Sequence, residues 1–394
     1  MANTLTNLLP DLYAGLDTVS RELVGFIPAV GRISTAERAA VGENVRYPIA
    51  PAGNSSNISP AMTVPEPTDQ TIGNGVIQIT KAKAAEFGFV GEEQLGLNNG
   101  PGYLSVQADM FAQALRVLVN EIESDVAAAA VASASRAWGE PGVNPFLTNT
   151  RDVAQLRKIL VDNGSPESDL GLVIDTTAGA DLRTLYGINT DRDWSSAPMS
   201  QQGVLITPHG MSIRESAQLP SHETGTAEGA TTTNAGFAVG ATTIALASAG
   251  TGDIHDGDVI SFAGDSNKYV VVTGDSDVSN GGSVVIQEPG LRQAIPAQAT
   301  EITVERNVQV SPVLQAWDAA GVAFYRNAIQ LATRAPALPQ EGDAALDRMT
   351  LTDPRSGLSF EVSVYPGYRK VRFEVAMAWG WKVTQPRHTA LLLR

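Results

Sequence analysis

Residues 105–138 read SVQADMFAQALRVLVNEIESDVAAAAVASASRAW, and the rest of the chain is organised around this stretch. Apolar residues recur every three or four positions, which predicts one face of a helix; they are Phe111, Leu115, Leu118, Ile122, Val126 and Ala129. Four polar residues are expected on the opposite face, namely Gln113, Arg116, Asn120 and Glu123. We expect Ser105 to cap the helix and Gly139 and Pro141 to end it.

The predicted helix is long, and its second half carries small side chains. A rise of 1.5 Å per residue gives a length of about 50 Å, more than a compact domain needs. Residues 127–134 are nearly all small, so another element can approach the helix backbone closely. The helix is therefore either a core helix of a large α+β protein or a rigid spine along which an elongated subunit is built.

The composition is that of a folded chain without cysteine chemistry. With 394 residues, 43% of them hydrophobic, we expect two or three domains with a substantial core. The absence of cysteine excludes disulfides and cysteine-based metal sites or nucleophiles. A net charge of −15 argues against wrapping nucleic acid, because few cations can neutralise phosphates. We find no signal-peptide pattern and no apolar run of membrane-spanning length, and we expect folding in the cytoplasm.

Residues 4–24 form a short amphipathic arm. Leucine and valine recur in it at helical spacing, interrupted by Pro10 and Gly15. The apolar side of such a short arm needs another surface to cover it. That surface belongs either to its own domain or to a partner.

Residues 45–90 have the composition of a long hairpin. A strand at Val45–Ile49 precedes a stretch rich in Pro, Ser and Asn at Pro51–Pro67, and a second strand returns at Val76–Thr80. Loops of this length are usually functional or disordered. Lys81 and Lys83 follow, either as charges that protect an exposed strand edge or as a contact between subunits.

After the long helix, helices and strands alternate. The expected elements are helices at Asp152–Asn163 and Ala178–Tyr186 and strands at Leu170–Ile174, Gly203–Thr207 and Met211–Leu219. Alternation of this kind predicts a small α/β lobe. Asp175 follows a strand, and we interpret it as a cap of the next helix rather than a catalytic carboxylate.

Residues 224–306 show hardly any helical period. Short β segments separated by Gly, Asp and Pro turns are expected at Thr243–Leu246, Val259–Phe262, Tyr269–Val272, Val284–Ile286 and Ile302–Val304. This spacing predicts a small β-barrel or sandwich. The segment holds ten Asp and Glu against three Lys and Arg, a net charge of −7, and we interpret it as an inserted domain with an acidic surface.

The C-terminal part is predicted to be mostly strands. The chain returns through Gly321–Ala335, and a meander of strands is expected at Met349–Leu351, Leu358–Val364, Val371–Ala378 and Trp381–Thr384. Pro366 and Gly367 suit a tight turn in which proline fixes φ and glycine supplies a positive φ. These strands need a helix over one face, and residues 105–138 provide the long candidate.

Catalytic motifs are missing from the sequence. No phosphate-binding loop, dinucleotide fingerprint, zinc-protease motif or nucleophile elbow occurs, and no two of the four histidines (His209, His222, His255 and His388) have metal-ligand spacing. Asp253–Asp258 could hold a cation, but it lacks the glutamate of a calcium loop, and we interpret it as a turn. Trp379 and Trp381 share one strand face and suit packing or a subunit contact. We therefore predict no catalytic, cofactor-binding or metal-binding residue, no cofactor, and no enzyme.

Residues 321–339, GVAFYRNAIQLATRAPALP, are the most specific stretch of the chain. With Phe324, Arg326, Ala328, Leu331, Ala332, Arg334 and Leu338–Pro339, this stretch resembles the major capsid (coat) proteins of tailed phages, in particular the short-tailed-phage coat family with an inserted β-domain. The ending Trp379–His388 with Leu391–Leu393 is similar to that family's closing strand. Ala241–Leu246 and Gly257–Gly264 look like parts of its inserted domain.

The resemblance implies an α+β fold, the tailed-phage/herpesvirus major capsid fold with a small inserted β-barrel domain. The implied parts are an N-terminal arm (1–44), an extended hairpin or E-loop (45–95), a P domain with the spine helix 105–138 (96–150), an α/β A domain (151–222 and 311–345), the inserted domain (223–310) and the P-domain C-terminal strands (346–394). The inserted domain would help folding or contact neighbours.

The function implied by the resemblance is that of a virion structural protein. Copies would assemble as hexamers and pentamers, with a separate scaffolding protein, a portal and a decoration protein, into an icosahedral procapsid that matures. The shell would form in the host cytoplasm and enclose double-stranded DNA without sequence-specific binding. The alternatives are the shell of a cellular nanocompartment with the same fold, or a carbohydrate-active hydrolase with a β-domain, for which a carboxylate pair would be needed.

Overall fold

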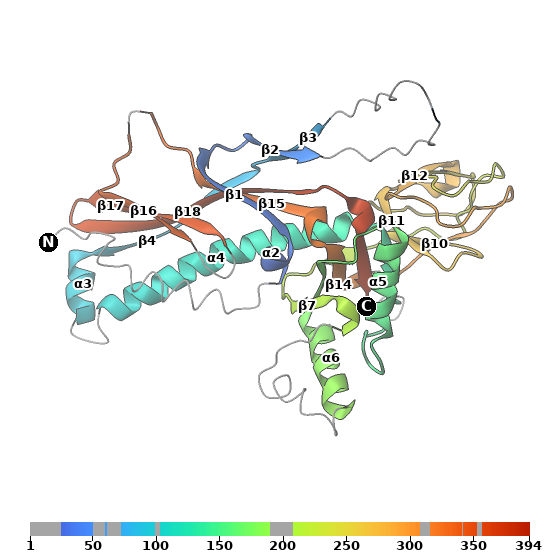
Figure 1. Cartoon of the computed structure of the whole chain (residues 1–394), viewed down its shortest axis with the longest axis horizontal. Coiled ribbons are helices and arrows are strands. Elements are labelled where there is room, and N and C mark those ends of the chain that lie inside the picture. Colours follow the sequence, from blue (N-terminus) through green and yellow to red (C-terminus); the bar gives the residue numbers. More distant parts are fainter. Residues whose placement is uncertain are drawn as a thin grey trace.

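The computed structural model describes residues 25–49, 60, 72–98, 103–189, 208–307, 316–340, 342–352 and 357–394. Within these residues the molecule is elongated (Figure 1). Helix α4 (Tyr103–Ala132) runs lengthwise along one sheet, and a lobe of helices and strands lies beyond its C-terminal end. The arm predicted at 4–24 lies outside the described residues.

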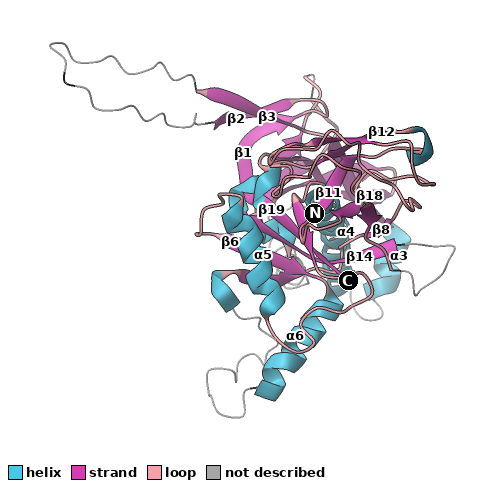
Figure 2. Ribbon diagram, turned by 90° about the vertical axis from the view of Figure 1, so that its right-hand side faces the viewer, coloured by secondary structure: helices cyan, strands magenta, loops and turns pink. Residues whose placement is uncertain are grey.

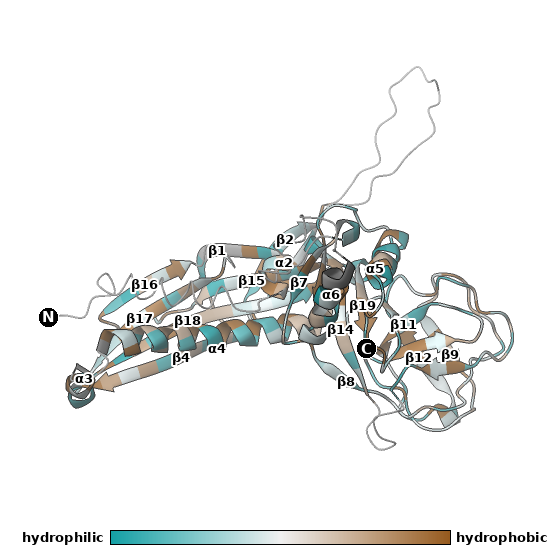
Figure 3. Ribbon diagram, turned by 90° about the horizontal axis from the view of Figure 1, so that it is seen from below, coloured by the Kyte–Doolittle hydropathy of each residue, from teal (hydrophilic) through white to brown (hydrophobic). Residues whose placement is uncertain are grey.

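A six-stranded sheet packs against α4. Its order is β1-β15-β18-β17-β16, and β4 also pairs with β18. The strands are β1 (Gly31–Ala39), β4 (Lys81–Val90), β15 (Ile329–Pro336), β16 (Asp347–Thr352), β17 (Ser359–Gly367) and β18 (Lys370–Val383). The ring of Phe111 on α4 lies 4.8 Å from Phe87 and 5.3 Å from Phe373, centroid to centroid. The long helix therefore covers the C-terminal strands, as the sequence predicted (Figure 3).

The boundaries of the long helix differ from the prediction. The helix begins at Tyr103, so Ser105 lies within the first turn and is not the cap. It ends at Ala132 instead of Trp138, because Arg136–Trp138 forms strand β5, which pairs with one strand on each side. As a strand, these residues form backbone hydrogen bonds with a neighbour on each side. As the last turn of a helix, their C=O groups would have no partner within the helix.

A second sheet forms the lobe. Its central path runs β5-β19-β14-β6-β7, in which β19 is parallel to β5 and antiparallel to β14. The elements are α5 (Arg151–Asp162), β6 (Leu170–Ile174), α6 (Thr176–Asn189), β7 (Ser212–Glu215), β8 (Ser221–Glu223), β14 (Ala316–Tyr325) and β19 (Thr389–Leu393). All five residues of β19 are buried, so the closing strand is central to the sheet. The strand predicted at Gly203–Thr207 lies outside the described residues.

The acidic segment contains five strands around a hydrophobic cluster of its own. They are β9 (Thr243–Leu246), β10 (Val259–Phe262), β11 (Lys268–Thr273), β12 (Gly282–Ile286) and β13 (Ile302–Val304). The order is β13-β10-β11-β12-β9, and bridges from Thr231 to Glu301 and from Thr232 to Leu246 close the ring. The ring is continuous with the lobe, because β11 also pairs with β5.

A two-stranded hairpin projects from the body (Figure 2). Its strands are β2 (Asn44–Ile49) and β3 (Gly73–Gln78), which pair antiparallel with each other. The predicted second strand, Val76–Thr80, ends two residues early. Residues 81–90, which were assigned to the same excursion, instead form β4 and pair along their whole length with β18. Helix α3 (Gly91–Asn98) then leads toward α4.

The turn between β17 and β18 also differs from the prediction. Pro366 and Gly367 still belong to β17, and the turn follows them. The residue with positive φ is Arg369, at +56°, and not Gly367. The predicted strands Val371–Ala378 and Trp381–Thr384 are one continuous strand up to Val383, because β15 and β17 pair with successive parts of it.

Candidate functional site

Glu123 on α4 holds the chain segment that enters the fold. Its carboxylate accepts hydrogen bonds from the backbone N–H groups of Gly25 and Phe26, both at 2.7 Å, and of Ile27 at 3.0 Å. These residues begin the short helix α2 (Phe26–Ala29), whose N-terminal N–H groups have no partner within the helix. Burial raises the pKa of Glu123, although these hydrogen bonds and one to Ser216 oppose the rise.

The prediction that Glu123 lies on the face opposite the apolar residues of the helix was wrong. The residue is 1% exposed. Val119 and Ala127, one turn before and one turn after it, are both buried. Residues four apart share a helix face, so this pair was the signal in the sequence that could have placed Glu123 inside.

A network of charges ties β4 to α4. Lys81 donates to Asp125 at 2.9 Å and to Glu121 at 3.0 Å, and Lys83 lies 2.5 Å from Glu121. Asp125 also accepts a hydrogen bond from the indole N–H of Trp379, at 3.0 Å. Hydrogen bonding to Asp125 raises the pKa of Lys81. Both lysines are therefore engaged within the chain, and the buried Trp379 serves packing.

The base of the projecting hairpin is fixed to the body. Ile77 and Ile79 pack in a small apolar cluster with Ala39, Ala332 and Ala378. A hydrogen bond of 2.8 Å joins the N–H of Gly42 to the carbonyl of Ile79, and another of 2.8 Å joins the N–H of Ile79 to the carbonyl of Glu43. The hairpin thus leaves the body in a defined direction.

The acidic turn Asp253–Asp258 is a structural turn. The buried Asp258 accepts hydrogen bonds from the backbone N–H groups of His255 and Gly225 and lies 2.9 Å from a ring nitrogen of His222. Asp253 accepts from Thr226, which lowers the pKa of Asp253 to about 2. No group of His, Asp and Glu suited to a metal ion occurs among the described residues.

The remaining candidate residues are Asp175, His388 and His209. Asp175 accepts a 2.7 Å hydrogen bond from the N–H of Ala178, as predicted for a cap. His388 is 4% exposed, and burial lowers its pKa. A ring nitrogen of His209 lies 3.1 Å from the hydroxyl of Thr150. None of the helices that the structure describes is long and apolar enough to cross a membrane.

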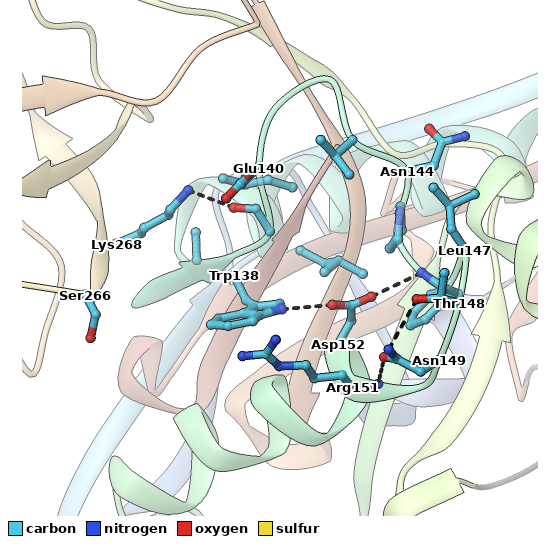
Figure 4. A pocket seen from close by; sticks show the side chains of 17 residues that line it. Trp138, Glu140, Asn144, Leu147, Thr148, Asn149, Arg151, Asp152, Ser266 and Lys268 are labelled. Carbon is cyan, nitrogen blue, oxygen red and sulfur yellow. Dashed lines mark hydrogen bonds between the residues drawn. The ribbon is translucent and has the colours of Figure 1, made fainter.

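A groove of about 570 Å³ lies between residues 139–149, α5 and β11 (Figure 4). Two carboxylates line it, Glu140 and Asp152, and Asp152 accepts hydrogen bonds from the indole N–H of Trp138 at 2.9 Å and from the N–H of Phe146 at 3.1 Å. Both bonds fix the loop that forms the wall of the groove. Asp152 therefore has a structural role here.

Comparison with known proteins finds similarity in structure alone. No family model and no curated protein sequence matches the chain. The capsid of the cyanophage P-SCSP1u is similar over 92% of this chain and 86% of its own, with 14% identity and a TM-score of 0.45. The Ralstonia phage GP4 capsid is similar over 94% and 88%, with 7% identity and a TM-score of 0.47. A virus-like particle from Pyrococcus furiosus is similar over 97% and 96%, with 11% identity and a TM-score of 0.40.

Proposed function

We propose that this protein is a capsid subunit whose activity is self-assembly into a closed shell. The observation that carries the proposal is the hairpin β2–β3, whose described strands pair with each other alone and project from the body (Figure 2). A two-stranded hairpin has little stability of its own in water. In a ring or shell, such an element gains contacts from a neighbouring copy through a heterologous interface.

The shape of the rest of the subunit supports the same proposal. The charge network and the aromatic contacts hold α4 firmly to the six-stranded sheet, which gives the subunit a stiff body. Stiff subunits keep the angles between neighbours fixed, as closed symmetry requires. We infer a shell of fivefold and sixfold clusters formed with a separate scaffolding protein and a portal, with double-stranded DNA inside.

The acidic charge fits a container for DNA. With a net charge of −15, the shell offers few cations for phosphates, so packaged DNA would not adhere to the wall. We assign no enzymatic step to the chain, because Asp152, Asp175 and Asp258 are each held by hydrogen bonds within the fold.

Expression with and without the proteins encoded beside this chain tests the proposal, with light scattering and negative-stain imaging as readouts. Closed particles of uniform diameter are expected in at least one condition. A protein that stays monomeric in every condition, at concentrations used for imaging, would overturn the assignment. Nucleic acid in particles from the natural source distinguishes a virus shell from a cellular compartment, which would hold protein cargo.

Deletion of residues 4–16 separates folding from assembly. We expect the shortened chain to keep the melting temperature of the parent protein and to lose closed particles. Normal shells formed by the shortened chain would show that the arm has no part in assembly.

A further inference from the structure

A positively charged cleft lies where α5, β5 and β11 meet. It has a volume of about 280 Å³ and adjoins the groove of Figure 4. Four of its lining residues are cationic and one, Asp162, is acidic; the cations are Arg136, Arg151, Lys158 and Lys268. A surplus of positive charge is unexpected at a cleft of a chain with net charge −15.

Arg136 is a buried cation whose hydrogen bonding is incomplete. Its side chain is 3% exposed and lines the cleft. It donates to Asn267 at 2.9 Å, to Asn163 at 3.0 Å and to the carbonyl of Ile159 at 3.1 Å. Its Nε atom has no hydrogen-bond partner in the described structure. Burial, together with the charge of Arg292, lowers the pKa of Arg136.

The anions near the cleft balance only part of this charge. Asp162 lies 3.9 Å from Arg136 and is itself 36% exposed, so the pair is long and partly screened. Lys268 is paired with Glu305 at 2.7 Å. For Arg151 and Lys158, no ion pair with another described residue is found. A buried guanidinium with so little compensation is costly unless an anion reaches it.

We propose that this cleft binds a phosphate group, as free phosphate or as the monoester of a nucleotide. The two negative charges of a phosphate group match the unpaired charges of Arg151 and Lys158 better than the single charge of a carboxylate does. Guanidinium groups also bind phosphate through several parallel hydrogen bonds. Ser266, which lines the same cleft, adds a hydroxyl donor. Figure 4 shows Ser266 and Lys268 on one wall and Arg151 on the other.

A bound phosphate would link three elements, of which β11 is far in the sequence from the other two. Arg136 lies on β5, Lys158 on α5, and Lys268 on β11 beside its pairing partner Ala137. The ligand would therefore join the lobe to the ring of residues 243–304. This inference does not depend on the shell function.

Calorimetric titration with inorganic phosphate, at an ionic strength held constant with sodium chloride, tests the site. We expect saturable binding to the wild-type protein and a rise in melting temperature that chloride alone does not give. The exposed pair Arg151→Gln and Lys158→Gln should weaken binding by about 10-fold or more, because two charge-assisted contacts are lost. Lys370→Gln, at the far end of the first sheet, is the matched control and should bind like the wild type.

A parallel titration with adenosine monophosphate distinguishes the two sources of the phosphate group. Binding of both probes indicates a cleft open to monoesters, and binding of inorganic phosphate alone indicates a closed anion site. The absence of saturable phosphate binding to the wild type would overturn the inference. Equal affinity in the double variant and in the control would also overturn it.

Discussion

Replacement of Glu123 by alanine is the sharpest test of how the chain enters the fold. The change removes the acceptor of three backbone N–H groups, at Gly25, Phe26 and Ile27. A buried donor without a partner costs about 1–3 kcal/mol, so three would cost about 3–9 kcal/mol if the segment stayed in place. The loss cannot exceed the free energy of releasing the segment from the body. Phe26 and Ile27 are fully buried, and the burial of each side chain contributes about 1.5–3 kcal/mol to that free energy. We expect a loss of about 3–5 kcal/mol, the range for breaking a buried network.

Denaturant unfolding of the unassembled protein, together with hydrogen exchange, measures this loss. The amides of residues 25–27 should exchange slowly in the wild type and rapidly in Glu123→Ala. Glu123→Gln keeps one acceptor oxygen and should lose about 1–3 kcal/mol. Glu121→Gln on the same helix is the control, and its partly exposed ion pairs predict less than about 1 kcal/mol. A cost below about 1 kcal/mol for Glu123→Ala, or unchanged exchange at these amides, would refute the reasoning.

Three further changes test the core, the charge network and the pH dependence. Ala130 is fully buried, so Ala130→Phe should cost about 1–3 kcal/mol by overpacking, measured by thermal unfolding. Asp125→Ala should cost about 1–3 kcal/mol, because it leaves the indole N–H of Trp379 and the ammonium group of Lys81 without this acceptor. Asp125→Asn should cost less, since its amide oxygen can still accept from the indole. Burial lowers the pKa of His388 from 6.5, so the unfolded chain takes up this proton more readily. The contribution of this histidine to the free energy of unfolding is complete above pH 6.5 and is lost as the pH falls below that value. His388→Asn should therefore flatten the dependence of the unfolding free energy on pH below 6.5.

Matched variants and contrary outcomes complete these tests. Val117→Phe is the matched variant for Ala130→Phe, because Val117 lies on the same helix and is 59% exposed. Equal destabilisation by Val117→Phe and Ala130→Phe would contradict the argument that Ala130 is tightly packed. Equal losses for the two Asp125 variants would show that the indole contact contributes nothing. A pH profile that is identical with and without His388 below pH 6.5 would contradict the lowered pKa of this buried histidine.

Periodicity predicted the regular elements well where one face of an element is uniformly apolar. The strands Leu170–Ile174, Val259–Phe262 and Ile302–Val304 have the predicted bounds. These are short apolar runs between turn residues, which is the pattern of a buried strand. The long helix was likewise recognised from its apolar face, and its role as the cover of the C-terminal strands was confirmed.

The sequence pattern did not predict the local structure where pairing with a distant segment of the chain decides it. Arg136–Trp138 has no strand signal in its three residues, and it is a strand because β19 and β11 flank it. The cleft around Arg136 was missed for the same reason, since its lining residues come from three separate parts of the chain. Helix propensity is a weak preference, which tertiary pairing overrides.

The sequence by itself determined the order of the elements, the apolar face of α4 and the absence of cysteine chemistry, because these depend on residue type and local spacing. The tertiary structure decided the rest. It brought Glu123 within 3.0 Å of three N–H groups almost a hundred residues earlier in the chain, and it paired residues 81–90 with β18. Such contacts depend on where the packed core brings distant backbone groups together, and a buried acceptor requires donors that no local pattern can supply.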